Sequence, residues 1–271
     1  MKHPHNHPTS AYVAHTDGHC TSSALTRGPW HPDHQHAGPP VALVCRAFEA
    51  EAHKHGLTHL ARLTANLLRP VPISDLEVKV ATIYVGRNAG HFSAKLMAAG
   101  KEVGVFSALA QRESEFLLPE GLPGHPLPTI ATPPKEATPA YFPFAGRHTG
   151  YSDLVETREA RGHIFDGPCA IWFRLHHPLV EGEAPSPYQR VAVAADSGNG
   201  ISAVLDYQRY SFVNSDLTIN LLRRPLGEWM CLDARTWLGS NGCGLAESAI
   251  YDEHGLIGRA SQSLAVRQLQ H

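Results

Sequence analysis

Asp196 is the residue whose position in the sequence most needs an explanation. Tyr188, Val191, Ala192 and Ala195 recur at the spacing of the buried face of a helix, and Asp196 continues that face. An ionised carboxylate pressed toward a core costs several kcal/mol unless it is hydrogen-bonded or reaches a wet cavity. Aimed into such a cavity, a carboxylate is a candidate for acid–base chemistry. The alternative is that Asp196 lies at the C-terminal end of the helix and points to solvent.

Gln262 is the second polar residue in an apolar row. It shares one face of the last predicted strand with Ala260, Leu264 and Val266. An amide that interrupts an apolar row is a candidate site residue. The alternative is a buried amide that is satisfied by neighbouring backbone groups.

Asn214 is a weaker candidate, because strict alternation places it with Asp216 and Thr218 on the polar face of its strand. A bulge, or the start of the strand, would turn its side chain inward. From the pattern alone, a turn or edge role is favoured.

Two similar sets of elements position these residues, and together they indicate an α+β fold. In each half of the chain a helix is followed by strands with alternating apolar residues. Residues 38–40, Gly-Pro-Pro, open the first helix and Gly56 ends it, since proline costs no hydrogen bond in a first turn. Ser186 caps the second helix, which runs to about Ser197. The predicted strands span 60–68, 76–85, 92–98 and 102–112, and then 211–222, 229–237, 244–252 and 258–268.

The halves resemble an internal duplication. Pro70 and Arg112 are separated by as many residues as Pro225 and Arg267, and similar residues lie between them. Coincidence among common residues is the alternative. Residues 113–149 are rich in proline and poor in periodic hydrophobicity, which predicts an extended linker. The predicted organisation is therefore a flexible His-rich N-terminus at 1–22, a first unit at 23–112 and a second unit at 150–271.

Composition excludes several classes of function. With 42% hydrophobic and 18% charged residues the chain can build a core, and a net charge of −2 gives no general attraction to nucleic acid. No apolar run is long enough for a membrane span, so a cytoplasmic protein is expected. The five cysteines lack a C-x-x-C pair, and the N-terminal histidines lie near a terminus with no fixed scaffold, so neither a metal nor another cofactor is predicted. Further pairing into a homo-oligomer through exposed sheet edges is expected.

At this point the sequence resembles the acyl-CoA thioesterase II family, the double-hotdog acyl-CoA hydrolases, and their actinobacterial relatives. The resemblance covers most of the chain and depends on these motifs: Arg27-Gly28-Pro29-Trp30, Gln35-His36-Ala37-Gly38-Pro39-Pro40, Leu68-Arg69-Pro70, Phe212-Val213-Asn214-Ser215-Asp216-Leu217-Thr218, Arg224-Pro225-Leu226-Gly227-Glu228-Trp229 and Gly258-Arg259-Ala260-Ser261-Gln262. It implies a double hotdog, in which each of two fused units wraps a long antiparallel sheet around a helix. It also implies hydrolysis of an acyl-CoA thioester to a carboxylic acid and coenzyme A.

In that family an Asp, a Thr or similar polar residue, and a Gln hold the attacking water. The resemblance assigns these roles to Asp196, Asn214 and Gln262, with Asn214 standing where better-known members have Thr. An amide can bond the water but cannot relay a proton as a hydroxyl does. We expect Asp196 to deprotonate the water in part, and backbone N–H groups near Gly38 to polarise the thioester carbonyl. His36 is expected either to line the acyl pocket or to serve only as a helix-entry residue.

Two other functions remain open at this point. An enoyl-thioester hydratase or dehydratase would use the same fold, but it needs a His paired with an Asp across the pocket, and no Asp-x-x-x-x-His begins a predicted helix. A protein that binds an acyl chain or acyl-CoA without turnover is the third possibility. The sequence has no G-x-S-x-G motif, which argues against a Ser-His-Asp thioesterase.

Overall fold

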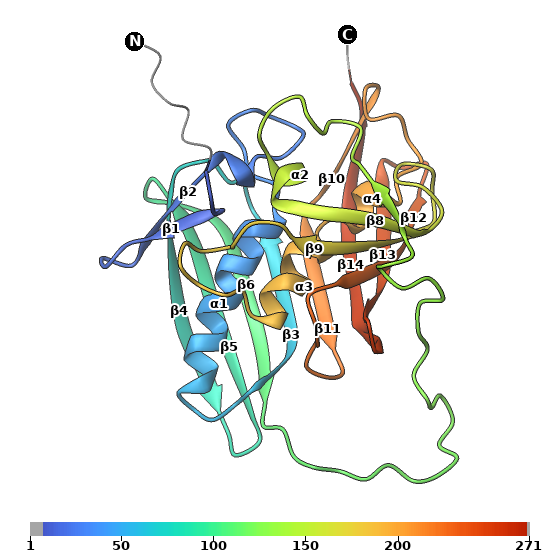
Figure 1. Ribbon diagram of the computed structural model, residues 1–271. Coiled ribbons are helices and arrows are strands. Elements are labelled where there is room, and N and C mark those ends of the chain that lie inside the picture. The colour runs from blue at the N-terminus through green and yellow to red at the C-terminus, as the bar shows by residue number, and fades with distance from the viewer. Residues whose placement is uncertain (1–7, 270–271) are drawn as a thin grey trace.

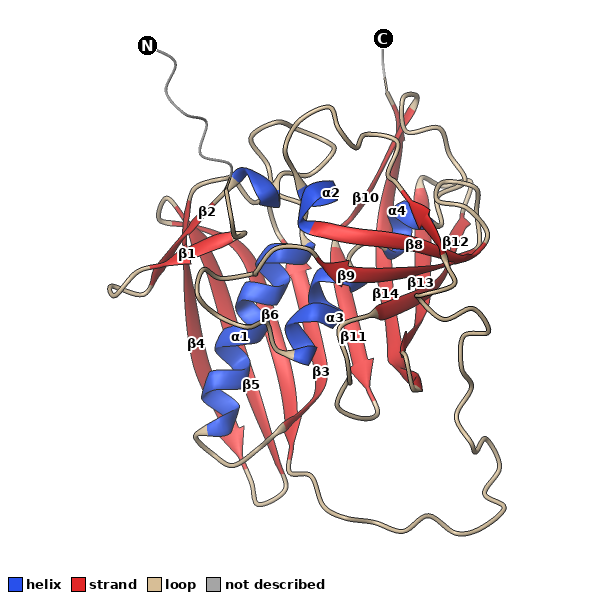
Figure 2. Cartoon of the chain, viewed as in Figure 1, coloured by secondary structure: helices blue, strands red, loops and turns tan. Residues whose placement is uncertain are grey.

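The computed structural model describes residues 8–269, which form one antiparallel sheet of 14 strands with two long helices against it. Figures 1 and 2 show these helices, α1 (Gly38–His53) and α3 (Pro187–Ala195), side by side in front of the sheet. The strand order is β1-β2-β4-β5-β6-β3-β11-β14-β13-β12-β9-β8-β7, and β10 also pairs with β14.

The first half contains α1 and the strands β3 (His59–Leu67), β4 (Asp75–Val85), β5 (Ala89–Ala98) and β6 (Lys101–Gln111). Pro39 and Pro40 occupy the first turn of α1, where the missing N–H groups remove no helical hydrogen bond. Ala99 and Gly100 make the tight turn between β5 and β6, and both have positive φ. These elements agree with the sequence-based prediction to within a few residues.

The second half repeats this plan with α3, the short α4 (Gly198–Ile201), β10 (Tyr210–Asn214), β11 (Asp216–Leu221), β12 (Met230–Leu238), β13 (Cys243–Asp252) and β14 (Gly255–Gln268). Ser186 caps α3, because its side chain accepts a hydrogen bond from the Gln189 N–H. Strand β11 pairs with β3 of the first half, so the two sheets are continuous across this seam.

The helices α1 and α3 run in opposite directions. Gly38, the first residue of α1, touches the backbone of Val193 near the end of α3. At the other end, Ser186 Oγ and Gln189 Nε2 donate to Glu49 Oε2 of α1, at 2.7 and 3.2 Å. Burial raises the pKa of Glu49, although these two hydrogen bonds oppose the shift.

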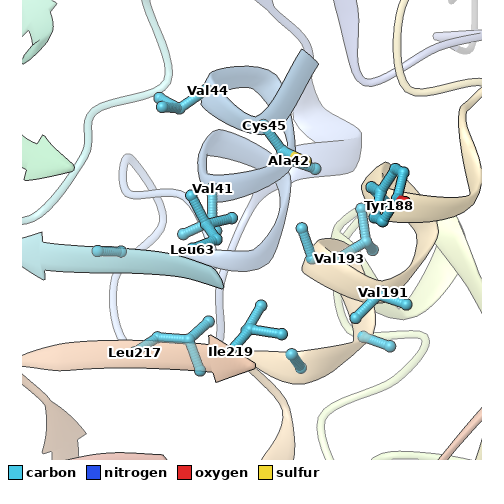
Figure 3. Close-up of a cluster of buried hydrophobic side chains, with 14 of the residues drawn as sticks. Val41, Ala42, Val44, Cys45, Leu63, Tyr188, Val191, Val193, Leu217 and Ile219 are labelled. Carbon is cyan, nitrogen blue, oxygen red and sulfur yellow. The ribbon is translucent and has the colours of Figure 1, made fainter. Parts of the chain in front are cut away.

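An apolar cluster fills the space between the helices and the sheet. Figure 3 shows side chains of α1 and α3 directed toward those of β3 and β11 at the seam. Leu63, Leu217 and Ile219 on the strands are all buried. Burial of this common core fixes α1, α3 and the seam relative to one another.

The predicted strand 211–222 is interrupted at Ser215, where β10 ends and β11 begins. Asn214 lies opposite Leu264 of β14, and Thr218 lies opposite Ser261 of the same strand. A step of four residues from β10 to β11 therefore corresponds to a step of three residues along β14. This extra residue is a bulge, and it changes which side chains face inward. Asn214 therefore shares the face of the buried Phe212, two residues before it in β10, and does not share the face of Asp216 and Thr218 in β11.

The structure adds elements that the sequence pattern did not reveal. The predicted flexible terminus at 1–22 contains β1 (Tyr12–Ala14) and β2 (His19–Ser22), which extend the sheet beyond β4, so the prediction is wrong for those residues. Residues 1–7, with the first three histidines, lie outside the described residues. The predicted linker at 113–149 forms the long loop after β6 in Figure 1, but it includes β7 (Thr138–Ala140). The second unit also contains α2 (Tyr151–Leu154), β8 (Val155–Arg161) and β9 (Cys169–Leu175).

Candidate active site

A cavity of about 380 Å³ lies where the two halves meet. Its walls come from the loop before α1, the segment after β3, the end of α3, β10 and the predicted linker. Most of the lining is apolar, and five aromatic rings contribute to it: Trp30, Phe142, Phe144, Phe165 and Phe212. A mainly apolar cavity with a few polar groups at one place is the usual form of a small-molecule site.

Asp196 is the buried carboxylate of this cavity. It follows the last residue of α3, is only 4% exposed, and lines the cavity wall. Its Oδ1 accepts a hydrogen bond from Asn214 Nδ2 at 2.9 Å. Its Oδ2 lies 3.1 Å from Nδ1 of His36. The carboxylate is therefore not directed to bulk solvent, and groups from both halves compensate its burial.

His36 belongs to the loop before α1, which is held in place by a bond from the His36 N–H to the Thr26 carbonyl at 2.7 Å. Its ring stacks on the ring of Tyr151, with centroids 3.7 Å apart and planes 2° apart. Tyr151 is itself fixed, because its hydroxyl lies 2.9 Å from the Val193 carbonyl and 2.8 Å from Ser197 Oγ. The imidazole therefore has one defined orientation toward Asp196.

Nδ1 of His36 has two competing neighbours. Besides Asp196 Oδ2, it lies 3.1 Å from the backbone nitrogen of Gly38. A protonated Nδ1 can donate to the carboxylate, and an unprotonated Nδ1 can accept from the Gly38 N–H, but one nitrogen cannot do both at once. We place the proton on Nδ1, because an unprotonated lone pair would be repelled by the buried carboxylate. Burial lowers the pKa of His36 despite the opposing effect of Asp196, so the ring is neutral near pH 7, with Nε2 unprotonated.

Gln262 lies next to Asp196 but behind the cavity wall. The side chain is 2% exposed and is not among the lining residues. Its Nε2 donates to the backbone carbonyl of Asp196 at 3.1 Å and lies 3.5 Å from Oδ1 of the same residue. Its Oε1 accepts from the Asn199 N–H at 3.0 Å. Gln262 thus holds the chain on both sides of Ser197, which fixes Asp196 in place.

Asn214 reaches the cavity because of the bulge described above. Its Nδ2 donates both to Asp196 Oδ1 and to the Asp216 carbonyl, the latter at 3.2 Å. Strict alternation therefore gave the wrong face for this residue. The structure brings Asp196, Asn214, Gln262 and His36 together.

Gly38 is adjacent to this group but does not line the cavity, whereas Ala37 does. A Cβ on Gly38 would overlap the Val193 carbonyl, so glycine is required for the close approach of α1 to α3. Pro39 and Pro40 have no N–H, which leaves Ala37 and Gly38 as the donors at this helix end. Within residues 8–269, the Ala37 N–H has no hydrogen-bond acceptor.

Comparison with family models gives two matches in chain order. Residues 26–112 match the acyl-CoA thioesterase N-terminal domain, and residues 126–266 match the acyl-CoA thioesterase C-terminal domain. The chain belongs to the acyl-CoA thioesterase family. The protein is therefore a thioester hydrolase, as the sequence resemblance indicated.

Solved structures confirm the double hotdog fold of this thioesterase. A hot dog fold protein of unknown function from Alicyclobacillus acidocaldarius is 16% identical, with a TM-score of 0.71 and coverage of 97% of each chain. The acyl-CoA thioesterase II TesB2 from Mycobacterium marinum is 12% identical, with a TM-score of 0.64 and coverage of 96% of this chain and 95% of that one. The tesB protein of Mycobacterium avium subsp. paratuberculosis is 13% identical, with a TM-score of 0.65 and coverage of 96% of each chain. No curated protein sequence gives a significant match.

Several residues of the thioesterase site were not predicted from the sequence. Tyr151 and Asn199 position His36 and Gln262, and neither carries a pattern that distinguishes it from ordinary core residues. Phe142 and Phe144 come from the predicted linker, where their spacing of two was the one available signal. Their rings stack with centroids 5.1 Å apart and form part of the cavity wall.

Two further features of the described part of the thioesterase concern metal sites and membrane-spanning helices. Between residues 8 and 269, no three His, Cys, Asp or Glu side chains gather as a metal site would require. None of the helices in that range has the length and apolar character of a membrane span.

Proposed function

We propose that the enzyme hydrolyses acyl-CoA thioesters to a carboxylic acid and coenzyme A, with the acyl group in the apolar cavity. The observation that carries this proposal is the Asp196–His36 pair. A buried carboxylate and a neutral imidazole, supplied by opposite halves of the chain, meet at the wall of a cavity lined mostly by apolar groups. Such a pair can remove a proton from water at neutral pH.

His36 is the proton acceptor in this mechanism. With its Nδ1 proton held by Asp196, Nε2 is the ring nitrogen left for the cavity, and a neutral imidazole is a stronger base than a carboxylate that already accepts two hydrogen bonds. Water loses a proton to Nε2 as its oxygen attacks the thioester carbonyl carbon. The carbon–sulfur bond then breaks, and the proton passes to the departing thiolate. Asp196 stabilises the imidazolium that exists between these steps.

The remaining polar groups hold this pair in position. Asn214 fixes the carboxylate through Oδ1, and Gln262 fixes the backbone of the same residue. The family resemblance implied that Gln262 holds the attacking water; in this mechanism it acts through Asp196 instead. Asn214 needs no hydroxyl, because in this scheme the proton travels through the imidazole.

The oxyanion that forms during attack needs hydrogen-bond donors. The Ala37 N–H is the candidate, since Ala37 lines the cavity beside His36 at the N-terminal end of α1 and its N–H has no acceptor among residues 8–269. The positive end of the helix dipole adds to this stabilisation.

The test is release of free thiol from a panel of acyl-CoA substrates that differ in chain length and aromatic content. We expect the wild-type protein to release thiol and Asp196→Asn to lose most of this activity. Asp166→Asn, a change in an exposed carboxylate outside the cavity lining, is the matched control and should be fully active. Saturable acyl-CoA binding without thiol release from any member of the panel would instead indicate a binding protein.

One observation favours a second candidate, an enoyl-thioester hydratase or dehydratase. This chemistry requires a His and an Asp facing one pocket, and the sequence showed no motif for such a pair. The structure forms one between the two halves, through His36 and Asp196. Loss of the enoyl-CoA absorbance without thiol release would identify this activity, whereas thiol release from saturated acyl-CoA identifies hydrolysis.

A further inference from the structure

A second cavity of about 590 Å³ adjoins the first. The two share the walls formed by Gly28, Pro29, Trp30, His31, Phe144, Phe165 and Val213. A ligand whose reacting group lies beside Asp196 can therefore continue past Trp30 into the second cavity without leaving the protein surface.

The charged side chains that line the second cavity, Arg27 and Arg147, are both cationic. His31 and His148 add two imidazoles to the lining. No aspartate or glutamate is among its lining residues, although the chain as a whole has a net charge of −2. Such a lining attracts an anionic ligand.

The two arginines differ in how they are held. Arg27 is half-buried, and its Nε and Nη1 donate to the carbonyls of Pro32 and Thr149, at 2.7 and 2.6 Å. Arg147 is exposed, and its Nη2 donates to the Tyr207 hydroxyl at 3.2 Å. A fixed cation beside an adaptable one suits phosphate groups, which guanidinium binds through paired hydrogen bonds.

Aromatic rings stand beside these cations. Trp30 is 46% exposed and lies on the boundary between the two cavities. Tyr207 and Phe165 line the second cavity, with ring centroids 5.5 Å apart. Rings of this kind provide flat faces on which a nucleobase can stack. The combination of cations and rings favours a ligand that carries both phosphates and a base.

We propose that the second cavity binds the nucleotide end of coenzyme A, with Arg147 and Arg27 holding its phosphate groups. The inference rests on the proposed function and extends it. It assigns the acyl group to the first cavity and the nucleotide end of coenzyme A to the second. It also gives Arg147, in the predicted linker at 113–149, a role in recognising coenzyme A.

The test compares hydrolysis of an acyl-CoA with hydrolysis of the same acyl group on pantetheine, which lacks the nucleotide. For Arg147→Glu we expect kcat/KM for the acyl-CoA to fall about tenfold or more, mainly through KM, because one ionic hydrogen bond contributes that much. The value for acyl-pantetheine should stay unchanged. Arg235→Ala, at an exposed arginine outside both cavity linings, is the control and should behave as wild type with both substrates.

A binding measurement separates this inference from the proposed reaction. Adenosine 3′,5′-bisphosphate, the nucleotide part of coenzyme A, can be titrated into wild type and Arg147→Glu by calorimetry. Weaker binding to the variant supports the inference even if the wild type hydrolyses no thioester. Equal binding to both proteins, or equal loss of activity toward acyl-CoA and acyl-pantetheine, would overturn it.

Discussion

Replacing Gln262 by leucine distinguishes the two roles that this side chain could have. In the structure the amide donates to the Asp196 carbonyl and accepts from the Asn199 N–H, and it does not line the cavity. Leucine has a similar size but makes neither bond. Two buried backbone groups then lose their partners, and each such loss costs about 1–3 kcal/mol. We therefore expect Gln262→Leu to lower the free energy of unfolding by about 2–6 kcal/mol, out of a typical total of about 5–15 kcal/mol.

The assay is urea unfolding followed by circular dichroism, with kcat for thiol release measured on the same preparations. Ser263→Ala is the matched control, because Ser263 is the next residue of β14 and is exposed on the opposite face. It should change the unfolding free energy by less than about 0.5 kcal/mol. If Gln262→Leu kept its stability within about 1 kcal/mol of wild type while kcat collapsed, the side chain would hold the reacting water. The anchoring role derived above would then be wrong.

Three further predictions follow from other contacts. Gly38→Ala places a Cβ against the Val193 carbonyl, so it should lower the melting temperature and the activity together, which thermal unfolding and thiol release would show. Glu49→Gln should raise the melting temperature at neutral pH. Burial raises the pKa of Glu49, so the wild-type protein loses stability as pH rises through that pKa. The glutamine variant has no charge to bury and avoids this loss. A variant less stable than wild type at pH 7 would contradict the prediction. Burial also holds the pKa of His36 below its ordinary 6.5. In the unfolded protein this imidazole therefore binds a proton more readily, so the free energy of unfolding should fall as pH drops below about 6.5. The value of kcat/KM should fall in the same range. His36→Asn should remove the contribution of this imidazole to the pH dependence of stability.

Much of the architecture was predictable because local signals agreed with the tertiary packing. The Gly-Pro-Pro start of α1, the Ser186 cap of α3 and the strand alternation each reflect a backbone preference that the fold also satisfies. Asp196 was predictable as a site residue for the opposite reason. A carboxylate on an apolar face conflicts with its surroundings, and such conflicts concentrate at functional sites.

The rest of the site depends on packing between distant segments. The pairing of His36 with Asp196 exists because the antiparallel helices bring the start of α1 to the end of α3, and no local spacing encodes that approach. Asn214 faces inward because of one extra residue at Ser215, which a strict two-residue alternation cannot represent. The role of Phe144 in both cavities was hidden because a proline-rich segment without periodicity resembles a linker whether or not it packs against the domain.

The most direct test of the catalytic proposal measures kcat for thiol release from one acyl-CoA substrate in four proteins: wild type, Asp196→Asn, His36→Gln and the double variant. Thermal unfolding of each protein confirms that it is folded. Because the two side chains form one acid–base pair, each single change should lower kcat by about 10²–10⁴-fold, and the double variant should be little worse than either. Folded variants that keep kcat near the wild-type value would show that the Asp196–His36 pair does not activate the water.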